Sequence, residues 1–254
     1  MKKNTKIIVG NWKMNPATRD EAEKIAKGVS KAGAKFSKTV AVMCPPALYV
    51  SSVAKTADNK KVFAGVQNIS TEPKGSFTGE ISAAMAKNAG ATYVIIGHSE
   101  RRTMGETNAQ VNKKVHLTLQ NKMTPIMCIG EDTRDDEGKY LSLIKDQLKE
   151  GLAEVVEANL AKIIIAYEPV WAIGAGAAMS AHEVHQMTIF ITKSLMEIYK
   201  TKTRIHVPIL YGGSVDPTNA FGILTEGEVE GLLVGRQSLD PAAFAEILRI
   251  ANSI

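Results

Sequence analysis

Short apolar runs alternate with longer amphipathic segments from one end of the chain to the other. The runs are rich in Val and Ile and carry few polar side chains, which is typical of strands buried on both faces. The predicted strands are Lys6–Asn11, Thr39–Cys44, Val62–Val66, Tyr93–Ile96, Pro125–Ile129, Lys162–Glu168, Val207–Tyr211 and Gly231–Val234. Strands that alternate with helices favour a parallel sheet covered by helices.

The intervening segments begin with helix-capping sequences. Three of them fit the capping box, in which the first and fourth side chains each accept a backbone N–H: Thr18–Glu21, Thr107–Gln110 and Ser180–Glu183. Asp216-Pro217 and Asp240-Pro241 each place an N-cap carboxylate before a proline at the first helical position. We expect a helix to begin at each of these points.

Eight strands and about as many helices within 254 residues have the size of one (β/α)8 barrel. The alternative is an open, doubly wound sheet. Against it, no G-x-G-x-x-G follows the first strand, and no linker or change of composition divides the chain. The predicted fold is therefore α/β, with residues 1–254 forming a single barrel domain.

Composition narrows the class of protein. With 44% hydrophobic and 22% charged residues the chain matches an ordinary globular protein, and no apolar run approaches the ~20 residues of a membrane span. The apolar stretch near the N-terminus is too short for a signal peptide. Cys44 and Cys128 are the only cysteines, which favours buried free thiols and a reducing cytoplasm. A net charge of +5 without an Arg-rich tract suits small anionic ligands at least as well as nucleic acid.

Candidate chemistry collects where the predicted strands end, which is where barrel enzymes place their catalytic residues. The first strand is followed by Asn11 and Lys13, the fourth by His98, and the sixth by Glu168. The last two strands lead into the glycine-containing segments Tyr211-Gly212-Gly213-Ser214 and Val234-Gly235, which match a phosphate site of backbone N–H groups. Such a set fits acid–base chemistry on a phosphorylated carbon compound.

Each candidate also has a purely structural interpretation. Glu168 could be a strand-end carboxylate paired with a lysine, but the apolar segment that follows it is suited to exclude water from a base. His98 could be a hydrogen-bonded core residue; at the start of a helical turn it would instead stay neutral and act as an electrophile. Lys13 could be solvated, and the glycines could only mark turns. His182-Glu183-Val184-His185 lacks the spacing of a metal motif, and no metal or other cofactor is predicted.

Four blocks of sequence resemble the triosephosphate isomerase family in order and spacing: Gly10–Asn15, Gly97–Arg102, Tyr167–Gly174 and Tyr211–Val215. The resemblance implies a TIM barrel that interconverts dihydroxyacetone phosphate and D-glyceraldehyde 3-phosphate without a cofactor. It also implies Glu168 as the base, His98 as the group that polarises and reprotonates the enediolate, Lys13 and Asn11 as stabilisers of its charge, and Glu100 as the partner of Lys13. The implied substrate-binding and phosphate-binding residues are Asn11, Lys13, Gly174, Ser214, Leu233, Gly235 and Arg236.

The same resemblance answers why an apolar segment follows Glu168: it implies a lid that excludes water and grips the phosphate. The lid residues are Pro169, Val170, Trp171, Ala172, Ile173, Gly174, Ala175, Gly176 and Ala177. Glu131 is expected to contact Trp171. The chain departs from the family pattern at Ala175-Gly176-Ala177, where Thr-Gly-Lys is usual, and at Gly235-Arg236, where Gly-Gly is usual.

A long segment without predicted helix or strand, from Gln67 to Glu80, resembles the dimer-forming third loop of the family. Gln67, Phe77 and Thr78 are its implied contact residues. A mobile surface loop is the plainer interpretation; the resemblance implies a homodimer, with no nucleic acid or membrane as partner.

Two other functions are alternatives at the level of sequence. One is a lyase or epimerase acting on a sugar phosphate, which would need a different set of bases. The other is a barrel kept as a binding scaffold, against which stand the three intact side chains Lys13, His98 and Glu168.

Overall fold

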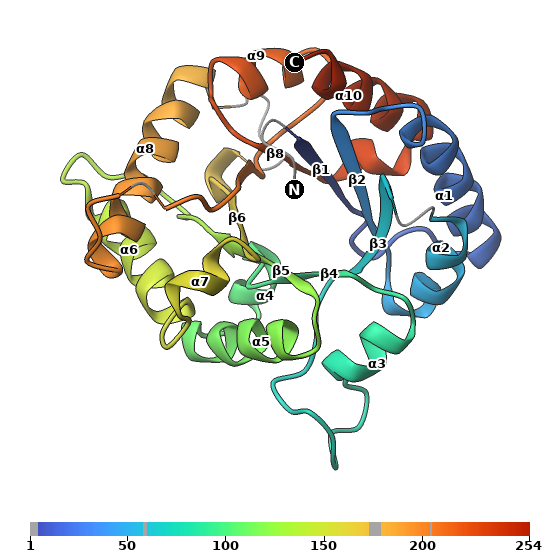
Figure 1. Cartoon of the computed structure of the whole chain (residues 1–254), viewed down its shortest axis with the longest axis horizontal. Helices are drawn as coiled ribbons and strands as arrows, with labels where there is room; N and C mark the ends of the chain where they lie inside the picture. The colour runs from blue at the N-terminus through green and yellow to red at the C-terminus, as the bar shows by residue number, and fades with distance from the viewer. Residues whose placement is uncertain (1–4, 58–59, 173–178, 204) are drawn as a thin grey trace.

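In a computed structural model that describes residues 5–57, 60–172, 179–203 and 205–254, parallel strands close into a barrel (Figure 1). The strands are β1 (Lys6–Asn11), β2 (Thr39–Cys44), β3 (Val62–Val66), β4 (Tyr93–Ile96), β5 (Thr124–Ile129), β6 (Ile164–Tyr167), β7 (Ile209–Tyr211) and β8 (Gly231–Val234). Each strand pairs with the next in sequence, and β8 pairs with β1. The closed order β1 to β8 confirms the predicted (β/α)8 barrel.

Helices form a ring outside the strands, as Figure 1 shows. They are α1 (Arg19–Gly33), α2 (Val50–Thr56), α3 (Ala83–Asn88), α4 (Ser99–Thr103), α5 (Asn108–Gln120), α6 (Lys139–Gly151), α7 (Glu157–Leu160), α8 (Ala181–Ile198), α9 (Ala220–Thr225) and α10 (Pro241–Ser253). Short 3-10 turns are η1 (Ala47–Tyr49), η2 (Val170–Ala172) and η3 (Arg236–Leu239). Among the described helices, none combines the length and hydropathy needed to cross a bilayer.

The predicted helix starts are confirmed at four of five places. Both hydrogen bonds of a capping box are present at Thr18, Thr107 and Ser180, and the Asp240 carboxylate accepts N–H groups in the first turn of α10. The prediction at Asp216-Pro217 is wrong, because α9 begins only at Ala220. The Asp216 carboxylate instead accepts the N–H groups of Thr218 and Asn219, which closes a turn before the helix.

Apolar side chains fill both the inside of the barrel and the layer between strands and helices. The interior cluster is built from residues of alternating strand positions, including Val9, Val42, Ile126 and Leu210, all fully buried. Cys44 and Cys128 are free, buried thiols within this cluster, as predicted, and burial raises the pKa of both. Because the interior is packed, chemistry is confined to the segments at the strand ends.

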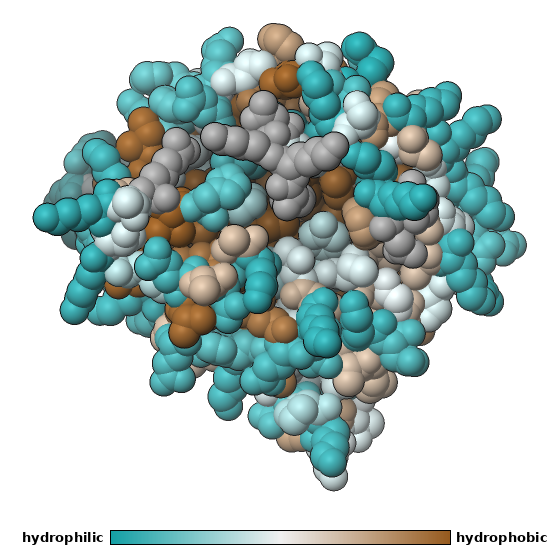
Figure 2. Space-filling model, in the orientation of Figure 1, coloured by the Kyte–Doolittle hydropathy of each residue, from teal (hydrophilic) through white to brown (hydrophobic). Residues whose placement is uncertain are grey.

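The segment between β3 and α3 projects away from the ring of helices (Figure 1). It contains no helix or strand from Gln67 to Ser82, and a few backbone bonds, such as Ser70 N–H to Ile81 O at 2.8 Å, hold its base together. Figure 2 shows hydrophilic side chains around the rim of the molecule and more hydrophobic ones toward the middle of the same face.

Candidate active site

Glu168 lies immediately after β6 and only 2% of its surface is exposed. Its backbone N–H donates to Ile129 O at 2.8 Å, which fixes the chain at the exit of β5 and β6. Carboxylate Oε2 accepts the Ser99 backbone N–H at 3.0 Å. Oε1 has no hydrogen-bond donor among the described residues, although His98 Nε2 lies 3.1 Å away without hydrogen-bond geometry. A buried carboxylate with one unsatisfied oxygen is arranged to accept a proton.

His98 is the N-cap residue of α4. Its Nδ1 accepts the backbone N–H of Glu100 at 3.2 Å, so the ring proton is assigned to Nε2, the nitrogen that faces Glu168. The imidazole is 7% exposed and therefore shielded from water. A neutral ring that presents an N–H can donate to a carbonyl oxygen, which is the role expected from the sequence.

The turn before His98 is held by buried polar contacts. Gly97 has φ 71°, a conformation that favours glycine, and its N–H donates to Glu106 Oε2 at 3.1 Å. The Gly97 carbonyl accepts from Arg102 Nε at 2.8 Å, and Arg102 also reaches Cys128 O at 3.1 Å and Asn108 Oδ1 at 2.6 Å. Arg102 thus ties the exits of β4 and β5 together.

Lys13 follows β1 in the left-handed region, with φ 54°. Such a conformation costs about 1–3 kcal/mol for a non-glycine residue and must be imposed by its surroundings. Here the Lys13 N–H donates to Asn11 Oδ1 at 3.1 Å and its carbonyl accepts from Gln67 Nε2 at 2.8 Å. The ammonium then lies 2.7 Å from Glu100 Oε1, so the expected pairing is present.

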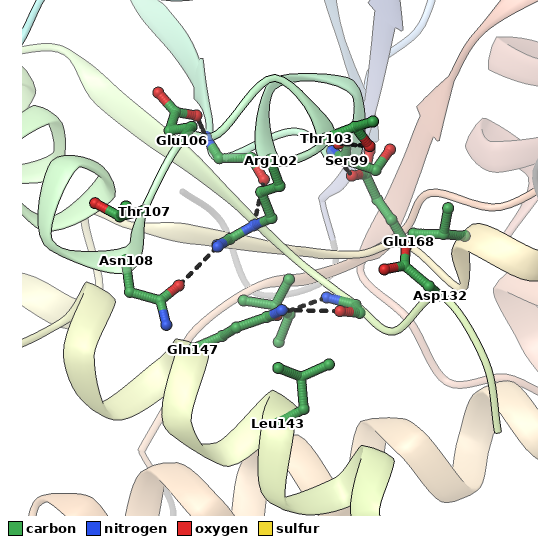
Figure 3. A pocket seen from close by; sticks show the side chains of 14 residues that line it. Ser99, Arg102, Thr103, Glu106, Thr107, Asn108, Asp132, Leu143, Gln147 and Glu168 are labelled. Atoms are coloured by element: carbon green, nitrogen blue, oxygen red, sulfur yellow. Dashed lines mark hydrogen bonds between the residues drawn. The ribbon is translucent and has the colours of Figure 1, made fainter. Parts of the chain in front are cut away.

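These contacts join the predicted catalytic side chains into one chain. Glu168 faces His98, His98 Nδ1 lies 3.7 Å from Glu100 Oε2, and Glu100 binds Lys13. Two cavities flank this chain. One, of about 310 Å³, is lined by Glu168 and by residues of α4, α5 and α6; Figure 3 shows Glu168 and Ser99 at one side of it and Arg102 and Asn108 at the other.

The second cavity, of about 450 Å³, brings together most of the predicted phosphate-binding residues. Its lining residues are Asn11, Trp12, Lys13, Asn15, Gly213, Ser214, Val215, Asp216, Gly235, Arg236, Gln237 and Leu239. A Cβ built on Gly235 would lie 4.0 Å from Lys13 Cε, so the lysine stem passes over this glycine. Leu233 does not line the cavity; its side chain is 3% exposed and packs inside the barrel.

The described part of the predicted lid begins with Pro169 and the turn η2, from Val170 to Ala172. Trp171 donates its indole N–H to Glu131 Oε1 at 3.0 Å, so the expected contact between them is present. The predicted lid residues Ile173, Gly174, Ala175, Gly176 and Ala177 lie outside the described residues.

Sequence reasoning missed the cation that neutralises Glu131. Arg134, in the segment that follows β5, is partly buried and donates to Glu131 Oε1 at 3.1 Å and to Tyr167 OH at 3.0 Å. Its guanidinium also faces the rings of Tyr140 and Trp171, each at 5.1 Å. The sequence could have indicated this contact, since Arg134 is the one basic residue of the acidic segment Asp132–Gly138, which directly follows Glu131, the expected partner of Trp171.

Gln67, which is predicted to serve a dimer contact, also supports the segments that follow β1 and β2. Its Nε2 donates to the carbonyls of Lys13 and Cys44, each at 2.8 Å. Phe77 and Thr78, by contrast, are exposed on the projecting loop.

Comparison with known proteins agrees with this geometry. The sequence model of the triosephosphate isomerase family matches residues 6–251. The chain is 41% identical to the triosephosphate isomerase of Rhodopirellula baltica over 249 residues, covering 97% of this chain and 98% of the relative. It is 40% identical to that of Dictyoglomus thermophilum, covering 96% and 98%. The crystal structure of the Bartonella henselae enzyme superposes with a TM-score of 0.81 at 33% identity, covering 96% of this chain and 98% of that one. The chain therefore belongs to the triosephosphate isomerase family.

Proposed function

We propose that this protein interconverts dihydroxyacetone phosphate and D-glyceraldehyde 3-phosphate by proton transfer through an enediolate, in glycolysis and gluconeogenesis. The observation that supports it most is the contact chain Glu168–His98–Glu100–Lys13, which brings a base, an N–H donor and a cation to one mouth of the barrel. Two free buried thiols fit a reducing cytoplasm.

Glu168 takes a proton from one carbon of the substrate and returns it to the neighbouring carbon. The unsatisfied Oε1 is the acceptor, while the Ser99 N–H on Oε2 holds the carboxylate in place. His98 Nε2–H donates to the oxygen on which negative charge develops, and its Nδ1, held by the Glu100 N–H, keeps the ring in that tautomer. Lys13 and Asn11 stabilise the same charge. This division of roles between a carboxylate base and a neutral imidazole is the one already established for triosephosphate isomerases.

The second cavity is where we place the phosphate. Ser214, Gly235 and Arg236 line it and offer backbone N–H groups, and Lys13 joins it to the catalytic chain. Together with Leu233 and Gly174 these remain the proposed phosphate-binding residues. The segment from Pro169 to Ala177 is the proposed lid, whose apolar residues exclude water from the enediolate.

The base assignment is tested by Glu168→Gln, measured in a coupled assay for triose phosphate isomerisation. Gln keeps the size of the side chain and an acceptor for the Ser99 N–H, but it cannot take a proton at neutral pH. We expect turnover to fall at least ~10²–10⁴-fold. Glu157→Gln, at an exposed glutamate of α7, is the matched control. A Glu168→Gln enzyme that keeps most of its turnover excludes Glu168 as the base.

We also propose that the protein, a single barrel domain, acts as a homodimer. Five of the ten large apolar side chains that are exposed among the described residues follow the four neighbouring strands β1 to β4: Met14 (94%), Leu48 (86%), Phe77 (47%), Met85 (57%) and Met104 (79%). Apolar residues gathered on one part of a surface mark a protein interface. A projecting loop beside them suits insertion into a second copy of the chain.

Light scattering of the wild type tests the dimer, followed by a variant in which residues 68–78 are shortened. We expect this variant to be a soluble monomer with much lower turnover, because the segment around Asn11 and Lys13 loses support from the partner. A fully active monomeric wild type at low concentration would refute the dimer proposal.

A further inference from the structure

The second cavity contains three charged lining residues, Lys13, Asp216 and Arg236. The charge of Lys13 is cancelled by Glu100, whose Oε1 lies 2.7 Å from its ammonium. Asp216 accepts three hydrogen bonds, from Thr218 N–H at 2.7 Å, Thr218 Oγ1–H at 2.6 Å and Asn219 N–H at 3.2 Å. The Thr218 hydroxyl, followed by the two backbone N–H groups, lowers the pKa of Asp216, so it stays an anion beside the proposed phosphate site.

Arg236 differs from the other two in having no partner among the residues that the structure describes. It is exposed, begins the turn η3 and has a negative φ, as expected for a residue that replaces glycine without backbone strain. Within the described ranges of the chain no carboxylate forms an ion pair with it and no acceptor takes a hydrogen bond from it. Its guanidinium charge therefore remains available at the rim of the cavity.

We propose that Arg236 supplies the unpaired positive charge that offsets Asp216 and so removes the repulsion between the cavity rim and the substrate phosphate, and that it is an affinity-determining residue of this protein. The inference rests on the proposed function, because it takes a phosphate dianion as the group that enters the cavity. The ion pair of Lys13 and Glu100 contributes no net charge, so in the absence of Arg236 the Asp216 carboxylate would leave the rim of the cavity negative. A dianion would then approach against repulsion, while with Arg236 the rim is neutral before the dianion arrives.

The expected change in phosphate affinity follows from Coulomb's law together with the screening of charges by salt. A unit charge roughly 8 Å from a dianion in water changes binding about five-fold. The Debye length is about 30 Å at 0.01 M salt and about 3 Å at 1 M, so the effect is nearly complete at the first and lost at the second. A direct, desolvated guanidinium–phosphate contact would instead keep most of its effect in salt.

The experiment compares Arg236→Gln, Arg236→Lys and wild type. The probe is inorganic phosphate, whose Kd is measured by titration calorimetry at low and high ionic strength, together with kcat/KM for triose phosphate. We expect Arg236→Gln to weaken phosphate binding and lower kcat/KM about three- to ten-fold at low salt, and by less than about two-fold at 1 M. Arg236→Lys, which keeps the charge, should stay close to wild type.

The control is Lys193→Gln, which removes one exposed positive charge from α8, outside the cavity. It should leave phosphate binding unchanged at both ionic strengths. If Arg236→Gln binds phosphate like this control at low salt, the inference is wrong. The inference is equally wrong if the loss of phosphate binding in Arg236→Gln persists at 1 M salt and Arg236→Lys does not restore binding. Those two results together would indicate a directed contact between the guanidinium and the phosphate. Calorimetry needs no turnover, so a wild type that binds phosphate but does not isomerise refutes the proposed function alone.

Discussion

Lys114 and Glu106 form a buried ion pair whose loss should lower stability by a calculable amount. The side chains are 5% and 3% exposed, and the ammonium bonds Glu106 Oε1 directly and Asn68 Oδ1 at 2.7 Å. Lys114→Met removes the cation and leaves the Glu106 carboxylate buried. Breaking such a pair from one side costs about 3–5 kcal/mol.

The lower end of that range applies here, because a second cation is close. Arg101 Nε lies 3.6 Å from Glu106 Oε1 and is partly exposed, so it can compensate some of the lost attraction. Unfolding entropy near 2.1 cal/mol/K per residue gives about 2 °C of Tm per kcal/mol for a chain of this length. We therefore expect Lys114→Met to lower Tm by about 6 °C.

A double variant separates the cost of an unpaired charge from the loss of packing. Glu106→Gln combined with Lys114→Met removes both charges, while Gln still offers an acceptor for the Gly97 N–H that precedes His98. Replacing both partners of a buried pair costs less than removing one. We expect the double variant to recover a large part of the lost Tm and to keep its turnover, because Gly97 stays bonded in both variants.

The assay is thermal unfolding followed by circular dichroism, at one protein concentration because assembly makes Tm depend on concentration. Turnover is measured on the same samples. A Tm decrease below about 2 °C in Lys114→Met would refute the reasoning. So would a double variant whose loss equals the sum of the two single losses, because two groups that interact cannot be additive.

Two further predictions concern Arg102 and Tyr93, which are both partly buried. Arg102→Lys keeps the charge, but a lysine cannot reach Gly97 O, Cys128 O and Asn108 Oδ1 at once. We therefore expect kcat to fall about 10–100-fold while the circular dichroism spectrum stays unchanged, and a fully active variant would contradict this expectation. Burial, with a smaller effect of Cys44, raises the pKa of Tyr93 to about 12. Because the folded pKa of Tyr93 exceeds the unfolded value of about 10, the stability that its neutral hydroxyl contributes is complete below about pH 10 and is lost as the pH rises toward about 12. The free energy of unfolding in urea should therefore depend less on pH between about 10 and 12 in Tyr93→Phe than in wild type.

Strand positions were predictable because they depend on local sequence. β1, β2, β3, β4 and β8 have the predicted bounds, since each apolar run ends at a glycine, a polar residue or a proline that marks the limit of pairing. β5 begins one residue earlier than predicted, at Thr124, and β6 ends one residue earlier, at Tyr167. β6 and β7 begin two residues later than predicted, because the apolar residues Ile163 and Val207 precede the first paired positions. The start of α9 was misjudged for a related reason: Asp216 caps a turn rather than a helix, and both use the same hydrogen bonds.

The contacts that orient the candidate site were not predictable, because they join residues far apart in sequence. Ser99 N–H meets Glu168 across 69 positions, and Gln67 reaches the Lys13 carbonyl across 54. Neither bond involves an unusual residue type or spacing. Only the closed barrel, which brings successive strand exits to one end, places these groups within hydrogen-bond distance.

Three glutamates of the described chain have almost fully buried side chains near this end of the barrel, and their surroundings distinguish the base. Glu106 is neutralised by Lys114, and Glu131 by Arg134 with two further donors, Tyr167 and Trp171. Glu168 forms no ion pair with a lysine or arginine within the described residues; it has one backbone N–H and the His98 ring opposite its unsatisfied oxygen. Glu168 is therefore the one of these three glutamates whose carboxylate has no ion pair with a lysine or arginine of the described residues, which suits it to move a proton in the substrate.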